Sequence, residues 1–233
     1  MKLNKLIAIA TISLLSGGIS MAQKALNLED IVAGNIIQTK GIGSMTWLKD
    51  GERYSRLENN KQTGGTDIVA YRAKDNSREV IIPSSLLTDK STGRPIPVRS
   101  VSWSADNEKV LIYNNTRRVW RYDTRGDYWV LNLKDGALRQ LGKGMPESSM
   151  MFAKFSPDGT RVAYVSNNNI YVEDIDSGKI TQLTKDGSDT IVNGTFDWVY
   201  EEEFSCRDGF RWSPDGKHIA YWQSDTKGTG VFD

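Results

Sequence analysis

Short apolar runs alternate with tight polar turns along the chain, and one such unit recurs. In each copy an aromatic residue leads into a turn, and a strand-like run follows the turn. The copies lie about 55 residues apart and begin at Trp47, Trp103, Phe155 and Trp212. In the last two copies the turn is Ser-Pro-Asp-Gly, in which Pro presets φ, Asp hydrogen-bonds to the backbone and Gly adopts a positive φ. The pattern therefore predicts a repeated β unit.

Each copy predicts several antiparallel strands, rich in β-branched and aromatic residues. The predicted strands are Arg53–Arg56, Asp67–Tyr71, Val110–Tyr113, Tyr128–Leu133, Leu138–Leu141, Val162–Val165, Ile170–Ile175, Lys179–Leu183 and Ile219–Trp222. Several strands per repeat at this period are typical of β-propeller blades, which stack because one blade cannot bury both faces of its sheet. A β-sandwich is the alternative, but four turns of one type in register disfavour it.

The fourth copy has its turn and first strand, and the next strand would begin only at Val231–Asp233. We therefore expect an all-β fold, an incomplete β-propeller of about three and a half four-stranded blades over residues 46–233. Residues 23–45 form a segment before the propeller. An open propeller leaves strand edges unpaired, so we expect the chain to be the N-terminal part of a longer protein.

Residues 1–22 have the pattern of a secretory signal peptide. A basic start is followed by the apolar run Leu6–Leu15 and by a small-x-small site ending at Ala22. Retention of this segment as a membrane anchor is the alternative. Cys206 is the only cysteine, so an internal disulfide is excluded. These features predict export to the periplasm or cell surface of a bacterium, where disulfides are optional.

Composition limits the chemistry further. The chain is 38% hydrophobic and 25% charged, and its formal net charge of +1 becomes about −1 without Lys2 and Lys5. No basic patch calls for a nucleic-acid partner, and one His with one Cys does not make a zinc site. The chain has no Gly-x-Ser-x-Gly motif, and His218 falls in a predicted strand. We expect no metal, no other cofactor and no catalytic residue in these 233 residues.

One acidic run requires a counter-ion. Glu201, Glu202 and Glu203 are consecutive and lie among the aromatic residues Trp198 and Phe204, which favour burial. Clustered carboxylates repel one another, and the repulsion grows where water is scarce. The cation is either an arginine of the chain, such as Arg207 or Arg211, or a group on a substrate.

The run Asp197–Glu203 resembles the dipeptidyl peptidase IV family of serine exopeptidases, which carries Asp-Trp-Val-Tyr-Glu-Glu-Glu at this place. The resemblance extends to Arg211–Gly216 after the run and to Phe155–Val172 before it, although one residue is missing between the glutamates and Trp212. It implies an eight-bladed propeller joined to an α/β-hydrolase domain, and the release of N-terminal dipeptides with Pro or Ala in second position. The catalytic triad would lie beyond Asp233, so the chain alone is expected to be inactive.

The resemblance also implies which residues bind the substrate. Glu202 and Glu203 would hold the amino group of a peptide with a free N-terminus. Arg121, in the pair Trp120–Arg121, would approach a substrate carbonyl, although Arg117, Arg118 and Arg125 lie nearby in the sequence. A homodimer of the complete protein and no membrane contact beyond the signal peptide are further implications.

Adjacent residues of a strand point to opposite faces. Glu202 and Glu203 can therefore reach one cation only if the segment leaves strand geometry, and we predict a helical turn or bulge here. Two alternatives remain: a non-catalytic periplasmic binding propeller of the Tol-associated type, and a relative of oligopeptidases or acylaminoacyl-peptidases that needs no free amine.

Overall fold

The computed structural model describes Asn27, Leu28, Val32, Gly41 and residues 43–230. The chain divides into two units, residues 1–42 and Gly43–Asp233. The predicted signal peptide, most of the segment 23–45 and the predicted strand start at Val231–Asp233 lie outside the described residues. In the described part of the chain, no helix is both long and apolar enough to cross a bilayer.

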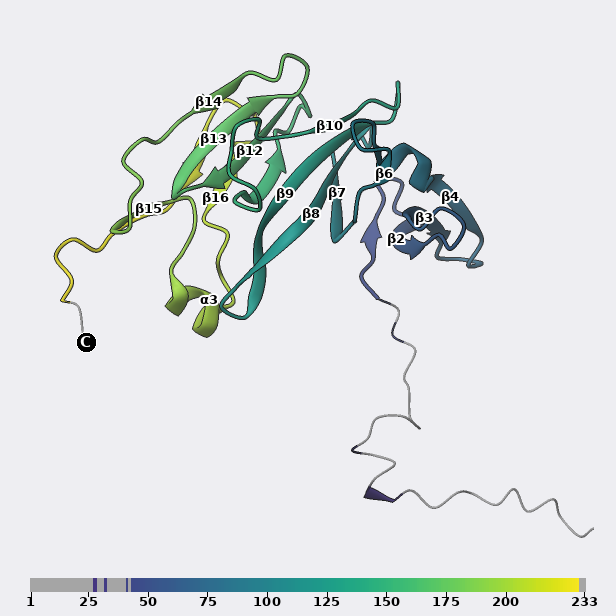
Figure 1. Ribbon diagram of the computed structural model, residues 1–233, viewed down its shortest axis with the longest axis horizontal. Coiled ribbons are helices and arrows are strands. Elements are labelled where there is room, and N and C mark those ends of the chain that lie inside the picture. Colours follow the sequence, from purple (N-terminus) through teal and green to yellow (C-terminus); the bar gives the residue numbers. More distant parts are fainter. Residues whose placement is uncertain (1–26, 29–31, 33–40, 42, 231–233) are drawn as a thin grey trace, which may run out of the picture. The chain divides into compact units, whose positions relative to one another are not determined.

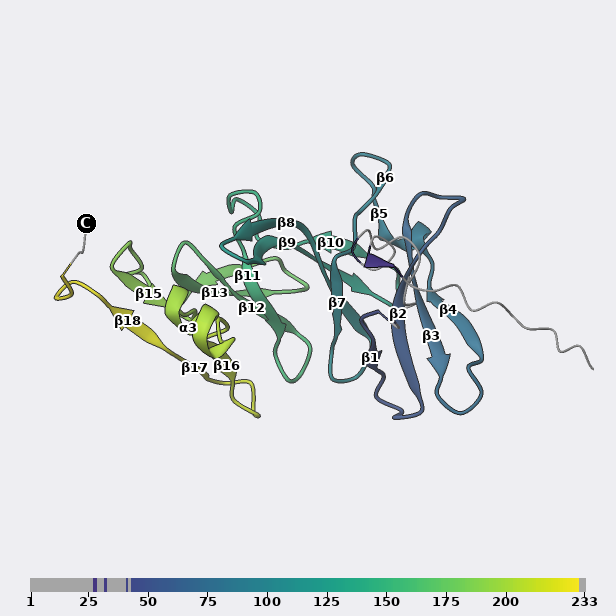
Figure 2. The ribbon, with the colours of Figure 1, turned by 90° about the horizontal axis from the view of Figure 1, so that it is seen from below.

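Three antiparallel sheets, each of four strands in chain order, make up most of the second unit. The first sheet contains β1 (Thr46–Trp47), β2 (Arg53–Asn59), β3 (Thr66–Arg72) and β4 (Arg78–Ile82). The second contains β7 (Ser100–Trp103), β8 (Lys109–Val119), β9 (Tyr122–Asn132) and β10 (Leu138–Gln140). The third contains β11 (Met151–Phe155), β12 (Arg161–Ser166), β13 (Asn169–Asp174) and β14 (Ile180–Gln182). Figure 2 shows the sheets following one another in chain order.

A fourth sheet is begun but incomplete among the described residues. Strand β16 (Phe210–Trp212) pairs with β17 (Ile219–Tyr221), and the chain then continues into β18 (Gln223–Asp225). Strand β18 pairs with β15 (Ile191–Asn193), a connection that the sequence pattern did not predict. The smaller elements are η1 (Ser84–Leu87), the hairpin β5 (Thr88–Asp89) with β6 (Arg94–Pro95), and helix α3 (Trp198–Phe204). Within the described residues, every predicted strand overlaps an observed one, and the predicted fold of propeller blades is confirmed.

The core lies between successive sheets because the middle strands are apolar on both faces. In β8, Val110 and Ile112 pack with the first sheet, whereas Leu111 packs with the third. Strand β12 follows the same rule, since Tyr164 packs toward the second sheet and Val165 toward Phe210 of β16. Alternate residues of a strand face opposite sides, and each fully buried aliphatic side chain contributes about 1.5–3 kcal/mol. Each sheet therefore depends on its neighbours for burial.

The recurring turn has the same hydrogen bonds in its later copies. In the third copy, Asp158 accepts from the Ser156 hydroxyl and from the Thr160 amide, and Gly159 has a φ of 67°. Asp106 and Asp215 accept from serine hydroxyls in the same way. In the second copy Asn107 takes the glycine position with a φ of 59°, since Asn tolerates this region better than most residues. The turn motif is thus a structural device for joining strands.

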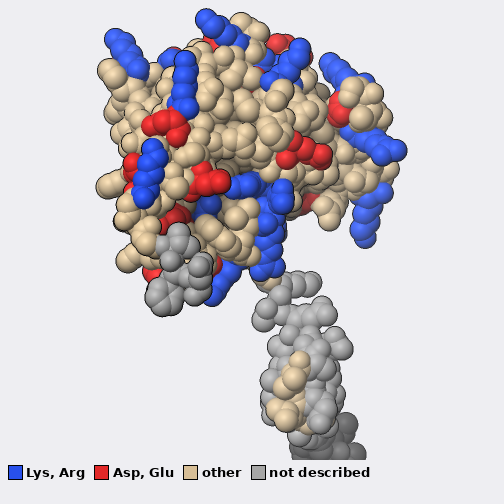
Figure 3. Space-filling model, turned by 60° about the vertical axis from the view of Figure 1, so that its left-hand side comes forward, with Lys and Arg blue, Asp and Glu red and all other residues tan. Residues whose placement is uncertain are grey.

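The surface carries both signs of charge. Over the face shown in Figure 3, Lys and Arg side chains are interspersed with Asp and Glu side chains. This distribution agrees with the formal net charge of only +1. A surface of this kind gives no long-range field of one sign over that face.

We predict that Asp158→Asn makes thermal stability less sensitive to acid. The Ser156 hydroxyl and the Thr160 amide lower the pKa of Asp158 from 3.8 to about 2. A lowered carboxyl pKa stabilises the fold above the unfolded-state value and loses this effect as the pH falls from 3.8 toward 2. The variant should unfold at a lower temperature than the wild type at pH 7 and show a shallower decline between pH 4 and pH 2.

The matched control is Asp176→Asn, which changes an exposed aspartate in another turn. Circular dichroism melting curves across this pH range make the comparison. If the melting temperatures of Asp158→Asn and the wild type declined equally over this pH range, the lowered pKa of Asp158 would not be a source of acid sensitivity.

Candidate functional site

The acidic run forms helix α3 rather than a strand. Asp197 caps its first turn by accepting a hydrogen bond from the Tyr200 amide at 3.2 Å, and Ser205 ends it in the left-handed region with a φ of 49°. Aspartate is favoured at this position because its side chain satisfies a free amide of the first turn. The predicted departure from strand geometry is confirmed. Adjacent residues on a helix lie about 100° apart, so Glu202 and Glu203 no longer point in opposite directions.

Glu201 is neutralised by the protein itself. Its side chain is 2% exposed, and its Oε2 accepts a hydrogen bond from Arg207 Nη1 at 2.8 Å. Arg207 Nε donates to the Thr195 hydroxyl at 3.1 Å. Arg211 takes no part in this pairing, since its guanidinium binds Asp208 at 3.1 Å. Of the two arginines that the sequence offered as counter-ions, Arg207 serves Glu201.

Glu202 is buried but only half satisfied. Its side chain is 5% exposed, and its Oε2 lies 2.6 Å from Arg121 Nε. Its Oε1 is buried without a hydrogen-bond partner, as is Oε1 of Glu201. A buried acceptor left without a donor costs about 1–3 kcal/mol. Oε1 of Glu202 can therefore accept a hydrogen bond from one further donor.

Arg121 lies in the two-residue turn between β8 and β9, and its side chain is 72% exposed. Figure 1 shows α3 beside the end of this long hairpin. Glu203, the next residue on the helix, is exposed, and its side chain has no hydrogen bond or ion pair with any described residue. The structure thus brings Arg121 and Glu202 together, with Glu203 next to them in the chain.

Two residues near this cluster were not assigned a binding role from the sequence. Trp120 precedes Arg121, adopts a φ of 54° and is 47% exposed. The guanidinium carbon of Arg207 lies 4.3 Å from the centroid of the Trp120 ring. The position of Trp120 next to Arg121 is the one feature of the sequence that could have indicated a role for Trp120. Nothing in the residue pattern places Arg207 beside Trp120.

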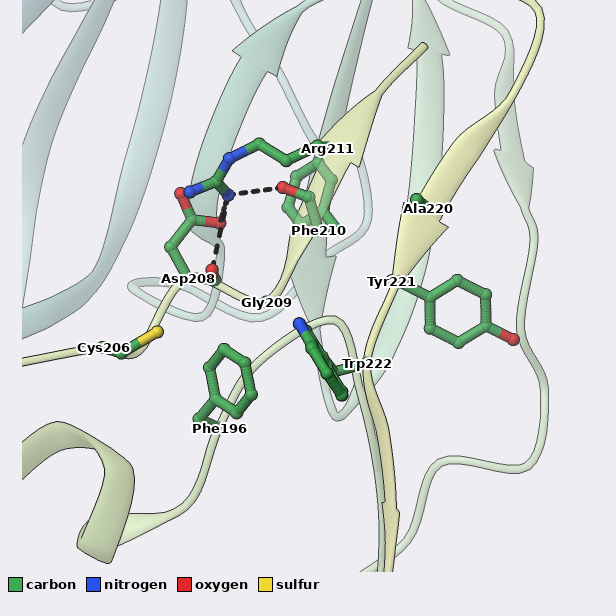
Figure 4. A pocket seen from close by; sticks show the side chains of 9 residues that line it. All are labelled: Phe196, Cys206, Asp208, Gly209, Phe210, Arg211, Ala220, Tyr221 and Trp222. Carbon is green, nitrogen blue, oxygen red and sulfur yellow. Dashed lines mark hydrogen bonds and ion pairs between the residues drawn. The ribbon is translucent and has the colours of Figure 1, made fainter. Parts of the chain in front are cut away.

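A cavity of about 480 Å³ lies beyond the helix, on the fourth sheet. Figure 4 shows the Asp208–Arg211 pair at one end and the rings of Phe196 and Trp222 at the other. Among the described residues, no group of three or more His, Cys, Asp or Glu side chains is arranged to hold a metal ion. Four of the nine residues that line the cavity are aromatic, and Asp208 and Arg211 form an ion pair within it.

Asp208 also anchors this region to the third sheet. Lys154 of β11 lies 2.6 Å from Asp208 and 3.6 Å from the centroid of the Phe210 ring. Burial lowers the pKa of Lys154 to about 8, although the Asp208 carboxylate acts in the opposite direction. The chain that follows α3 is thus tied to β11.

The fold and the site together define a class: a β-propeller region that presents buried carboxylates on a short helix inserted between its third and fourth sheets. Residues 104–233 match the family described as "Dipeptidyl peptidase IV (DPP IV) N-terminal region". The chain belongs to this family, whose members with similar sequences are named as peptidases. The resemblance noted from the sequence is confirmed.

Known relatives and a solved structure agree with this membership. A "Probable dipeptidyl-aminopeptidase B" of Chaetomium globosum is 35% identical over 133 residues, which are 57% of this chain and 14% of the relative. A protein of the same name from Aspergillus terreus is 28% identical over 220 residues, 90% of this chain and 24% of the relative. The crystal structure of Porphyromonas gingivalis dipeptidyl peptidase 4 superposes with a TM-score of 0.70 at 26% identity, covering 87% of this chain and 28% of that one. The chain therefore spans less than a third of the length of each of these proteins.

We predict that Glu201→Ala lowers the free energy of unfolding by about 3–5 kcal/mol, because it leaves the buried Arg207 guanidinium without its counter-ion. Urea denaturation measures the change. Glu203→Ala, on the exposed side of the same helix, should change stability by about 0.5 kcal/mol or less. Similar losses for the two variants would show that Glu201 and Arg207 do not form a stabilising pair.

Proposed function

We propose that this chain is the N-terminal, substrate-binding part of a secreted dipeptidyl peptidase IV-like serine protease. The complete enzyme releases Xaa-Pro or Xaa-Ala dipeptides from free N-termini. Glu202 and Glu203 bind the substrate ammonium group, and Arg121 binds a substrate carbonyl. The proposal depends on one observation above all: Oε1 of Glu202 is a buried carboxylate oxygen that accepts no hydrogen bond.

The ammonium group of a peptide supplies the missing donors. Its pKa is roughly 8, so it is mostly protonated at neutral pH, and its hydrogen bonds to carboxylates are charge-assisted and short. Glu202 offers its free Oε1, and Glu203 offers an unpaired carboxylate one residue further along α3. Because Arg121 already pairs with Glu202, the second carboxylate balances the charge that the ammonium group adds.

Arg121 has donors to spare for a carbonyl. Its Nε is used by Glu202, whereas a guanidinium carries five N–H donors in all. Because the rest of the side chain is exposed, its terminal nitrogens are accessible to a ligand. The ion pair with Glu202 then holds the arginine beside the ammonium site.

In this mechanism the site positions the substrate and does not transfer protons. Fixing the amino terminus sets how far the chain extends toward the catalytic serine, which we place in the part of the enzyme beyond residue 233. A blocked terminus leaves Oε1 of Glu202 buried without a donor, and losing one partner of a buried charged pair costs about 2–5 kcal/mol. Binding energy of this kind appears in kcat as well as in KM.

Membership of the family and the names of its relatives as dipeptidyl peptidases support this proposal. Secretion is supported by the apolar run at the N-terminus. We propose a peptide with a free N-terminus as the partner of the site.

We predict that Glu202→Gln in the complete enzyme lowers kcat/KM for Ala-Pro-p-nitroanilide by roughly 30-fold or more, because an amide no longer balances the ammonium charge. Glu79→Gln, which neutralises a 66% exposed glutamate on β4, should leave kcat/KM unchanged. N-acetyl-Ala-Pro-p-nitroanilide should be a poor substrate of the wild type. Equal turnover of the free and acetylated substrates would refute the ammonium-binding role.

We also expect the 233-residue chain alone to show no peptidase activity. The catalytic groups are proposed to lie outside it. Incubation of the purified chain with Gly-Pro-p-nitroanilide checks this. Release of p-nitroaniline above the rate of a buffer blank, retained through purification, would contradict the placement of the triad.

A further inference from the structure

The guanidinium of Arg207 contacts three separate segments of the chain. Its Nη1 binds Glu201 on α3 at 2.8 Å, and its Nε binds Thr195, just before α3, at 3.1 Å. Its guanidinium carbon Cζ lies over the ring of Trp120, 4.3 Å from the ring centroid, in a cation–π contact. The side chain is only 11% exposed. Arg207 thus fills a gap between helix α3 and the end of the β8–β9 hairpin.

The backbone of Arg207 is itself held in place. Its carbonyl accepts hydrogen bonds from the Phe196 amide at 3.0 Å and from the Thr195 hydroxyl at 3.0 Å. The next residue, Asp208, forms the ion pair with Lys154 of β11. The guanidinium is therefore a fixed point tied to the third sheet, against which the helix and the hairpin can both be aligned.

The partners of Arg207 are the immediate neighbours of the proposed ligands. Glu201 precedes Glu202 on the helix, and Trp120 precedes Arg121 in the turn. Trp120 adopts a positive φ of 54°, which is unfavourable for a bulky residue, so an external contact is needed to hold the turn in this shape. The cation–π contact with Arg207 supplies one, beside the hydrogen bond that Arg118 Nε donates to the Trp120 carbonyl at 3.1 Å.

We propose that Arg207 is a positioning residue, which sets the distance between Glu202 and Arg121 by holding Glu201 with its edge and Trp120 with its face. The proposal rests on the substrate-binding role of Glu202 and Arg121. Arginine suits this task better than lysine, because only a planar guanidinium stacks on a ring while donating in fixed directions to a carboxylate.

The test uses the complete enzyme with Arg207→Met, Arg207→Lys, Trp120→Ala and Trp120→Phe. Trp120→Ala keeps the test valid if Arg207 variants fold poorly, because Trp120 is half-exposed at the end of a hairpin. The matched control is Arg139→Met, which breaks a similar pair with Glu173, a residue 2% exposed, between the second and third sheets. Arg139 has no contact with α3 or with the β8–β9 turn among the interactions of the described residues.

Kinetics with Ala-Pro-p-nitroanilide give the first readout. We expect Arg207→Met and Trp120→Ala to raise KM roughly tenfold and to lower kcat/KM by a larger factor. Their effects should be less than additive in the double variant, since each removes the same contact. Trp120→Phe should retain most of the activity, and Arg207→Lys should not restore it. The proposal would be overturned if Arg207→Met and Trp120→Ala lowered kcat/KM no more than Arg139→Met does. Fully additive losses of kcat/KM in the double variant would overturn it as well.

Amide hydrogen exchange gives a second readout that needs no activity. Residues 117–124 and the helix Trp198–Phe204 should exchange faster in Arg207→Met than in wild type, and should be unchanged in Arg139→Met. If the wild type fails to release dipeptides, the proposed function fails, and exchange alone decides whether Arg207 holds the two segments together. Unchanged exchange in both segments would overturn the positioning role.

Discussion

The middle strands of the second and third sheets are apolar on both faces, so each of these sheets needs a neighbouring sheet on both sides to bury them. Strand β8 shows the constraint most clearly, because Val110 and Ile112 face the first sheet while Leu111 faces the third. The sheets must therefore stack in chain order, and stacking fixes where their connections lie. The β8–β9 hairpin of the second sheet and the helix that follows the third are brought together as a result.

Within that arrangement, three adjacent glutamates occupy three different electrostatic environments. Glu201 is buried and paired with Arg207, Glu202 is buried and paired through one oxygen with Arg121, and Glu203 is exposed. A helix makes this division feasible because it turns successive side chains by about 100°. The chain's own arginines thus relieve the repulsion evident in the sequence at Glu201 and Glu202, and Oε1 of Glu202 is left to accept a hydrogen bond from a further cation.

Much of the fold could be predicted from the sequence, because the spacing of apolar residues and the residue types that form tight turns are local properties of the chain. The strand at Val162–Val165 followed from the residue pattern. The helical departure at Glu202 and Glu203 followed from strand geometry together with the shared role that the family resemblance implied for both glutamates. The pairing of β15 with β18 and the stacking of Arg207 on Trp120 could not be predicted, since both depend on how sheets pack. The choice of Arg121 came from the family resemblance, because the residue pattern alone did not separate it from the neighbouring arginines.

The central claim is that the buried carboxylate of Glu202 receives the amino terminus of a peptide. A crystal structure of the complete protein with bound Ala-Pro dipeptide tests it most directly. We expect the peptide nitrogen to lie about 2.7–3.1 Å from Oε1 of Glu202, with the Glu203 carboxylate bound to the same nitrogen. A dipeptide bound with its amino group away from α3, and Glu202 still paired only with Arg121, would contradict it.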